Sequence, residues 1–95
     1  MMWLERWGAA MIDNYCTPKV MLTRGFGSRV WDTEGNEYVD LIAGIAVNAL
    51  GHGDPRVIAA MTEQWSAIGH VSNLYATESG MALAERLIGL VGDDS

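Results

Sequence analysis

Three short runs of strand-forming residues, separated by glycine-containing connections, constrain the fold of this chain most strongly. The runs are residues 20–22, 29–31 and 37–39. A Gly-Phe-Gly step at 25–27 separates the first two, and Thr-Glu-Gly-Asn at 33–36 separates the last two. Connections of this length between β-branched and aromatic residues are typical of β-hairpins. The sequence therefore predicts a three-stranded antiparallel meander over about residues 20–41.

The clearest helix signal follows this meander, at about residues 55–68. Asp54 is the expected N-cap and Pro55 takes the first helical position. Gly69 is expected to end the helix in the left-handed conformation. The apolar residues at helical spacing are Ile58, Met61, Trp65 and Ile68. They form one stripe, as expected for a helix that buries a single face.

Two further helices are predicted, one toward each end of the chain. Over about residues 3–15, apolar residues recur at helical spacing until Pro18 prevents continuation. Over about residues 78–91, Thr77 is the expected cap and Gly92 the expected stop. The apolar face of this last helix consists of Leu83, Leu87 and Leu90.

An apolar, glycine-interrupted segment at residues 41–49 lies between the meander and the helix at 55–68. Its small residues indicate extended chain that packs closely against other groups. The predicted fold class is therefore α+β: an N-terminal helix, a three-stranded antiparallel meander and two amphipathic helices.

The chain is too short to bury all of its apolar residues comfortably. A compact domain of 10.3 kDa exposes roughly 5,400 Å², against about 15,000 Å² when unfolded, so about 64% of its surface is buried. Four of the 95 residues are Trp, which a domain of this size cannot easily cover. Some apolar surface is therefore expected to lie against more polypeptide or a second subunit.

The charge and the cysteine count exclude several classes of function. The net charge is −6 and the six Lys and Arg residues are scattered, whereas nucleic acids and anionic membranes need clustered positive charge. The longest apolar run has about ten residues, half of what a membrane span needs. No signal peptide is recognisable, and the single cysteine excludes an internal disulfide. We expect a cytoplasmic protein that binds neither nucleic acid nor membranes.

The reactive side chains give no catalytic signature of their own. Two His and one Cys match no metal-binding spacing, so no metal site is predicted. No G-x-S-x-G motif is present. Lys19, the only lysine, is expected to be an exposed loop residue and not an amine in a desolvated pocket. His52 stands before a helix N-terminus, where it would face an anion or fill a polar niche in a turn; we favour the turn.

Two segments are better candidates for a site. Residues 44–52 are nearly free of charge and rich in small residues, which allows a ligand or another backbone to approach closely. Residues 72–75 form a polar-aromatic cluster between two predicted helices, a place where sites often form. Core packing accounts for the first segment equally well, and helix capping accounts for Ser72 and Asn73.

Taken together, these segments closely resemble the N-terminal part of the class-III aminotransferases of PLP fold type I. Within that class they resemble the acetylornithine aminotransferase family, and the resemblance covers nearly the whole chain. The segments that carry it are DNYCTP at 13–18, RGFG at 24–27, VWDTEGNEYVD at 30–40, GIAVNALGHGDP at 44–55 and SNLYATE at 72–78.

The resemblance implies which parts of such an enzyme this chain contains. The family's Schiff-base lysine, its turn for the PLP phosphate, and its aspartate and arginine for cofactor and substrate all lie C-terminal to the matching region. We therefore expect no large PLP-binding domain, no catalytic or cofactor-binding residue and no activity in these 95 residues alone. A smaller departure is Cys16, where the family usually has glycine; if that position has a positive φ, Cys16 is strained.

The resemblance also assigns roles to the two candidate segments. The segment containing Gly44, Val47 and Asn48 is expected to line the substrate channel. The linker containing Ser72, Asn73 and Tyr75 is expected near the interface of a homodimer. Ornithine aminotransferase has tyrosine in place of Gly44, where it meets a free amino group, so glycine leaves room for an N-acetyl group.

The complete enzyme implied by this resemblance uses pyridoxal 5′-phosphate. It transfers the δ-amino group of N-acetylornithine to 2-oxoglutarate in arginine biosynthesis. Three alternatives remain open: an ornithine or other ω-amino-acid aminotransferase, a non-catalytic interaction module made of the same lobe, and a gene remnant.

Overall fold

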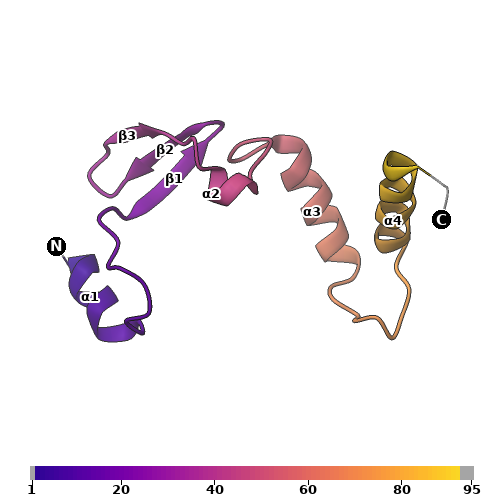
Figure 1. Cartoon of the computed structure of the whole chain (residues 1–95), viewed down its shortest axis with the longest axis horizontal. Coiled ribbons are helices and arrows are strands. Elements are labelled where there is room, and N and C mark those ends of the chain that lie inside the picture. Colours follow the sequence, from indigo (N-terminus) through magenta and orange to yellow (C-terminus); the bar gives the residue numbers. More distant parts are fainter. Residues whose placement is uncertain (1, 93–95) are drawn as a thin grey trace. The chain divides into compact units, whose positions relative to one another are not determined.

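The computed structural model describes residues 2–92 and has the predicted α+β composition (Figure 1). Its elements are α1 (Met2–Ala10), β1 (Leu22–Phe26), β2 (Arg29–Asp32), β3 (Glu37–Val39), α2 (Ala43–Ala46), α3 (Pro55–Ala67) and α4 (Glu78–Val91). The chain divides into two units, residues 1–59 and 60–95.

The three strands form the predicted antiparallel meander, in the order β1-β2-β3. Phe26 pairs with Arg29 across the first turn, and Val30 pairs with Tyr38 across β2 and β3. Gly27, at φ 58°, adopts the left-handed conformation that such a tight turn requires. Val30, on the central strand, is 5% exposed and is the one buried apolar side chain of the described residues.

The Asp32 carboxylate organises the second hairpin turn. Its Oδ1 accepts the backbone N–H groups of Glu34 and Asn36, both at 2.9 Å. Its Oδ2 accepts the Asn36 side-chain amide at 3.0 Å and the Tyr38 hydroxyl at 2.8 Å. These donors, Asn36 foremost, lower the pKa of Asp32 to about 2. The bond to Asp32 raises the pKa of the Tyr38 phenol in return.

The expectation of extended chain at residues 41–49 is wrong. The segment contains α2, a single turn whose backbone is left-handed, with Gly44 at φ 65°, ψ 31° and Ile45 at φ 64°, ψ 61°. The N–H groups of Val47 and Asn48 close this turn on the Ala43 carbonyl, at 2.9 and 2.8 Å. The small residues of this segment predicted that another group packs closely against its backbone. The close backbone contact instead lies within the segment, between Ala43 and residues 47–48.

The N-terminal helix is shorter than predicted, because α1 ends at Ala10 and not near Tyr15. The chain bends over the next residues, where the Asn14 N–H donates to the Ile12 carbonyl at 2.9 Å. Asp13 and Asn14 are weak helix formers, and the spacing of apolar residues alone does not reveal where the helix ends.

The other two helices match their predicted bounds closely, and their N-caps are confirmed. Asp54 Oδ1 accepts the N–H groups of Arg56 and Val57, and Thr77 Oγ1 accepts that of Gly80. Gly92, at φ 99°, follows α4 as predicted. The prediction for Gly69 is wrong, since it does not have a positive φ. Its Cα lies under the Trp65 ring, where an added Cβ would be 3.3 Å from a ring carbon.

Burial within the described chain falls far short of a compact domain. The accessible surface is 8672 Å², well above the roughly 5,400 Å² expected for a folded chain of this mass. The helices α3 and α4 do not pack against each other, and their apolar faces are exposed; Trp65 is 75% exposed. The expected core is therefore not formed by these residues alone.

Candidate functional site

Residues 40–52 form a loop whose two ends are fixed to the β1–β2 turn. At one end the Asp40 N–H donates to the Ser28 carbonyl at 2.7 Å. At the other end His52 and Gly27 exchange backbone hydrogen bonds of 2.9 and 2.8 Å, as in an antiparallel bridge. The candidate channel segment is thus positioned by the hairpin.

A hydrogen bond between Asp40 and His52 closes this loop. His52 Nε2–H donates to Asp40 Oδ2 at 2.7 Å, and the two side chains are 31% and 17% exposed. Asp40 Oδ1 accepts the N–H groups of Ala43 at 2.9 Å and Ile42 at 3.2 Å. The bond from His52, followed by that from Ala43, lowers the pKa of the Asp40 carboxyl. His52 is therefore a turn histidine with a polar partner, as we favoured.

Two glycines permit the close contacts around His52. A Cβ built on Gly25 would lie 2.6 Å from Cγ of the His52 ring. A Cβ built on Gly51 would lie 2.8 Å from the carbonyl oxygen of Gly27, and Gly51 has φ 80°. Neither position has room for a side chain. The sequence predicts Gly25 as part of a hairpin turn and Gly51 as part of the candidate segment 44–52, but it does not predict that both positions exclude a side chain.

Three predicted channel residues, Gly44, Val47 and Asn48, lie together on one side of the left-handed turn. An added Cβ on Gly44 would be 3.2 Å from Asn48 Nδ2 and 3.8 Å from Val47 Cβ. Gly44 is exposed and Asn48 is half-buried. The turn thus presents bare backbone beside one amide side chain, which can accommodate an apolar group and hydrogen-bond a polar one.

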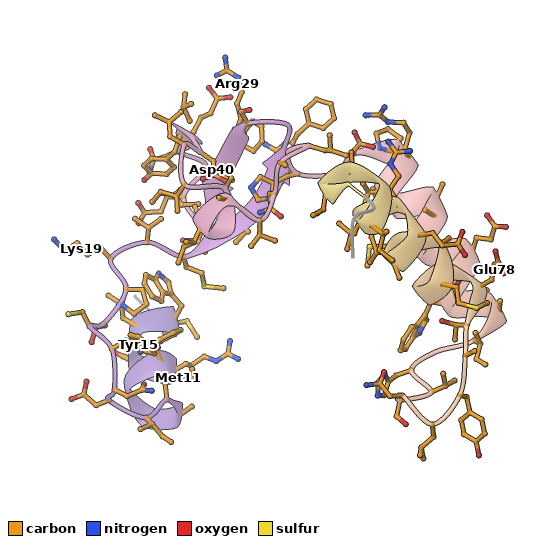
Figure 2. All side chains as sticks on the ribbon, turned by 45° about the vertical axis from the view of Figure 1, so that its right-hand side comes forward. Met11, Tyr15, Lys19, Arg29, Asp40 and Glu78 are labelled. Carbon is orange, nitrogen blue, oxygen red and sulfur yellow. The ribbon has the colours of Figure 1, made fainter. Side chains whose placement is uncertain are left out.

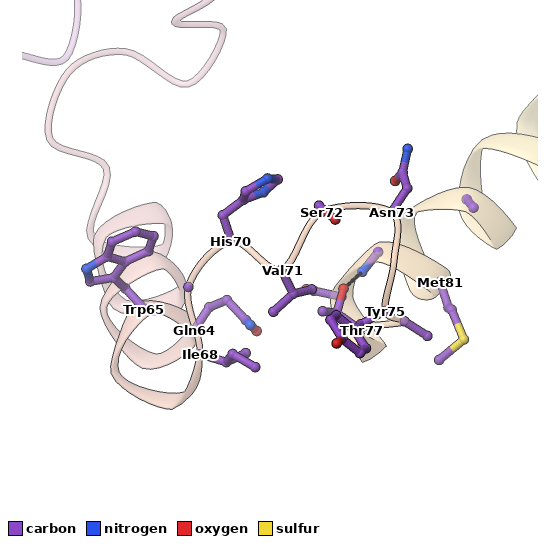
Figure 3. Close-up of a pocket in the computed structure, with 15 residues that line it drawn as sticks. Gln64, Trp65, Ile68, His70, Val71, Ser72, Asn73, Tyr75, Thr77 and Met81 are labelled. Atoms are coloured by element: carbon purple, nitrogen blue, oxygen red, sulfur yellow. Dashed lines mark hydrogen bonds between the residues drawn. The ribbon is translucent and has the colours of Figure 1, made fainter.

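The second predicted cluster lines a pocket between α3 and α4. The pocket holds about 630 Å³ and is lined by residues of the linker and the helix ends, including Trp65, His70, Ser72, Asn73 and Tyr75 (Figure 3). Ser72 has φ 59°, and its Oγ accepts the Leu74 N–H at 3.1 Å. The structure therefore brings Ser72, Asn73 and Tyr75 to one concave surface within residues 60–92.

Asp40 is the residue that the sequence analysis missed. It appeared there only as part of a matching string, although a carboxylate directly after a strand is a common turn former. That spacing was the available signal. The partner of Asp40, twelve residues away, was not readable from local pattern.

Lys19 is exposed on the loop between α1 and β1, as predicted, and Figure 2 shows its side chain extending from that loop. Cys16 is a free, exposed thiol and does not have a positive φ, so the expected strain is absent. Residues 2–92 contain no group of His, Cys, Asp and Glu side chains that could hold a metal ion. None of the helices formed by these residues has the length and apolar character to cross a membrane.

Comparisons with known proteins agree on one family. The model of the family "Aminotransferase class-III" matches residues 11–95. An acetylornithine aminotransferase of Mycobacterium tuberculosis is 56% identical over 90 residues, which are 95% of this chain and 22% of that protein. The chain thus spans about 22% of the length of this curated relative.

Two solved structures show the same arrangement of elements. N-acetylornithine aminotransferase from Stenotrophomonas maltophilia is 40% identical with a TM-score of 0.76, covering 90% of this chain and 22% of its own. Acetylornithine aminotransferase from Elizabethkingia anophelis is 28% identical with a TM-score of 0.88, covering 99% of this chain and 23% of its own. The described fold therefore corresponds to the N-terminal part of such enzymes.

Proposed function

This chain belongs to the class-III aminotransferase family, and on that premise we propose that it is the N-terminal portion of an acetylornithine aminotransferase. The complete enzyme would transfer the δ-amino group of N-acetylornithine to 2-oxoglutarate in the cytoplasm. The observation that carries this proposal is the identity to the Mycobacterium tuberculosis relative over nearly all of this chain.

The residues of this chain would contribute to substrate binding. We assign Gly44, Val47 and Asn48 to the lining of the substrate channel. Gly44 has no side chain and is exposed, so the backbone at this point leaves space for the N-acetyl group. Free ornithine would leave that space empty and its ammonium without a partner, which is costly in a desolvated site.

The linker residues Ser72, Asn73 and Tyr75 would lie at the interface of a homodimer. Their pocket is open, and Tyr75 is 73% exposed, so this surface is accessible to another chain. A half-apolar, half-polar concave surface of this kind suits an interface next to a small-molecule site.

We expect that these residues do not themselves form a site for pyridoxal phosphate. The cofactor, when bound to a complete enzyme, supplies the electron sink for amino transfer. It needs an amine held in a desolvated pocket, but the only lysine is Lys19, which is exposed. We therefore expect these 95 residues alone to be inactive, and we derive no catalytic step from them.

The experiment is to co-express this chain with the part of the Mycobacterium tuberculosis relative that follows the matching region. Transamination of N-acetylornithine should require both pieces and should survive Lys19→Ala. Gly44→Tyr should reduce kcat/KM for N-acetylornithine by about 100-fold, a loss of roughly 3 kcal/mol, and should affect ornithine less. Gly44→Ala is the matched control, because it carries the same backbone penalty without the bulk.

The outcomes separate the candidate functions. Equal losses on both substrates in Gly44→Tyr would indicate misfolding from backbone strain at Gly44, whereas full retention of activity on N-acetylornithine would remove the argument for the acylated substrate and favour an ornithine or other ω-aminotransferase. Binding of the two pieces without turnover would favour an interaction module. Turnover by this chain alone would show that its chemistry lies in residues that we have not assigned.

A further inference from the structure

Four consecutive residues of α2 have a left-handed backbone that side-chain packing does not explain. Ala43, Gly44, Ile45 and Ala46 have φ of 52°, 65°, 64° and 63°. Three of them carry a Cβ, and this conformation persists in L-residues only where the surroundings hold it. Ile45 is 86% exposed, so burial of its side chain does not hold the turn.

Hydrogen bonds at the two ends of the segment can hold it instead. One oxygen of the Asp40 carboxylate accepts the N–H groups of Ala43 and Ile42, which enter the turn. The other oxygen accepts Nε2–H of His52, beyond the end of the segment, at 2.7 Å. A single carboxylate therefore joins the entrance of the left-handed turn to the residue that follows its exit.

His52 can serve as the fixed partner because the hairpin holds its backbone and its ring. Gly27 exchanges two backbone hydrogen bonds with it, at 2.8 and 2.9 Å. The ring lies against the bare Cα of Gly25, with no room even for a methyl group between them. The ring nitrogen is thus directed at Asp40 by contacts that are independent of the turn.

We propose that Asp40 and His52 are positioning residues that hold residues 43–46 in the left-handed conformation. If the proposed function holds, the pair also fixes Gly44 and Asn48 at the substrate channel, and this role alone rests on the proposed function. The dependence of the turn on the Asp40–His52 pair concerns the chain itself and is measured without substrate or cofactor.

The experiment is hydrogen exchange of backbone amides in the full chain. In His52→Ala, the amides of Ala46, Val47 and Asn48 should exchange about tenfold faster, because local opening becomes easier. The amides of β2 should change by less than about twofold. His52→Gln retains an N–H donor and should restore part of the protection. His70→Ala, at the other histidine, is the control and should change neither set.

A second variant displaces the His52 ring without removing its nitrogen. Gly25→Ala places a methyl group where the base of the ring now lies. Exchange of the amides of residues 46–48 should therefore again accelerate more than exchange of the β2 amides, relative to the unmodified chain. Unchanged exchange at 46–48 in both variants would overturn the proposal, and so would equal acceleration in the turn and in β2. A failure here leaves the Gly44→Tyr comparison of substrates unaffected, so the two proposals fail separately.

Discussion

The two ends of this molecule are stabilised in different ways. In the hairpin region, residues 22–52, three strands and two carboxylates, Asp32 and Asp40, satisfy the backbone locally with little apolar burial. In the helical region, residues 60–92, the helix geometry is regular but the apolar faces remain uncovered. Polar contacts specify the first region, whereas the second has an apolar pattern that remains exposed within the described residues.

This difference predicts where each region is sensitive to substitution. The hairpin region depends on particular atoms at close range, so single backbone contacts should matter there. The stability of the helical region depends on burial of its apolar faces, which are exposed in the described residues. Isolated helices of 13 or 14 residues are marginal in water. Its single contacts should therefore matter less than the presence of a partner.

The largest expected effect is that of Gly51→Ala. The new Cβ would lie 2.8 Å from the Gly27 carbonyl oxygen, and Gly51 has φ 80°. The substitution therefore causes a steric clash and also places a side chain on a left-handed backbone. We expect about 3 kcal/mol less protection of the Gly27 and His52 amides, measured by hydrogen exchange. Gly8→Ala, in α1 and with open space around it, is the matched control and should not destabilise. Similar exchange in both variants would mean that the loop is not fixed to the hairpin.

Acid should open the hairpin region through Asp32. The pKa of Asp32 in the folded state is about 2, below its ordinary value of 3.8, so the carboxylate stabilises the fold fully above the unfolded pKa. That contribution should be lost as the pH falls from about 4 through 2. Fluorescence against pH measures it in a chain whose other three tryptophans, Trp3, Trp7 and Trp65, are replaced by Phe so that Trp31 alone reports, and Asp32→Asn should flatten the transition in that range. A transition of equal size in Asp32→Asn would assign the acid sensitivity to another group.

The smallest expected effect is that of Thr77→Ala in the helical region. Loss of the hydrogen bond to the Gly80 N–H should cost α4 about 1 kcal/mol. Circular dichroism at about 222 nm should show reduced helix content, while exchange in β2 stays constant. Thr62→Ala, inside α3, is the control for loss of a threonine. Loss of protection of the β2 amides in Thr77→Ala would show that the two regions are coupled and would contradict their independent stabilisation.

The elements that the sequence predicted well are those with a strictly local cause. The hairpins follow from glycine turns between β-type runs, and the starts of α3 and α4 follow from Asp54 and Thr77. The short α1 was missed because apolar spacing does not register the weak helix propensity of Asp13 and Asn14. The left-handed turn was missed because its cause is non-local: Asp40 and His52 lie twelve residues apart, and both are fixed by a hairpin that sequence pattern does not place in space.

The candidate site was predictable to the same extent. Resemblance to a family selected Gly44 and Asn48, and the structure adds the backbone conformation that brings them into contact. Ser72, Asn73 and Tyr75 were indicated by their place between two predicted helices, resemblance gave them a role, and they line one pocket. The position of Asp40 after a predicted strand indicates a turn former, but it does not indicate the hydrogen bond to His52, because that partner lies twelve residues away.

The central claim is that the helical region is built to be covered by further polypeptide. Sedimentation velocity of the 95-residue chain tests it most directly. We expect self-association or loss to the pellet, reduced when Met61→Glu and Trp65→Glu are introduced into the α3 stripe, which is exposed at both positions. A single monomeric species of 10.3 kDa that unfolds cooperatively would contradict the claim and identify an autonomous module.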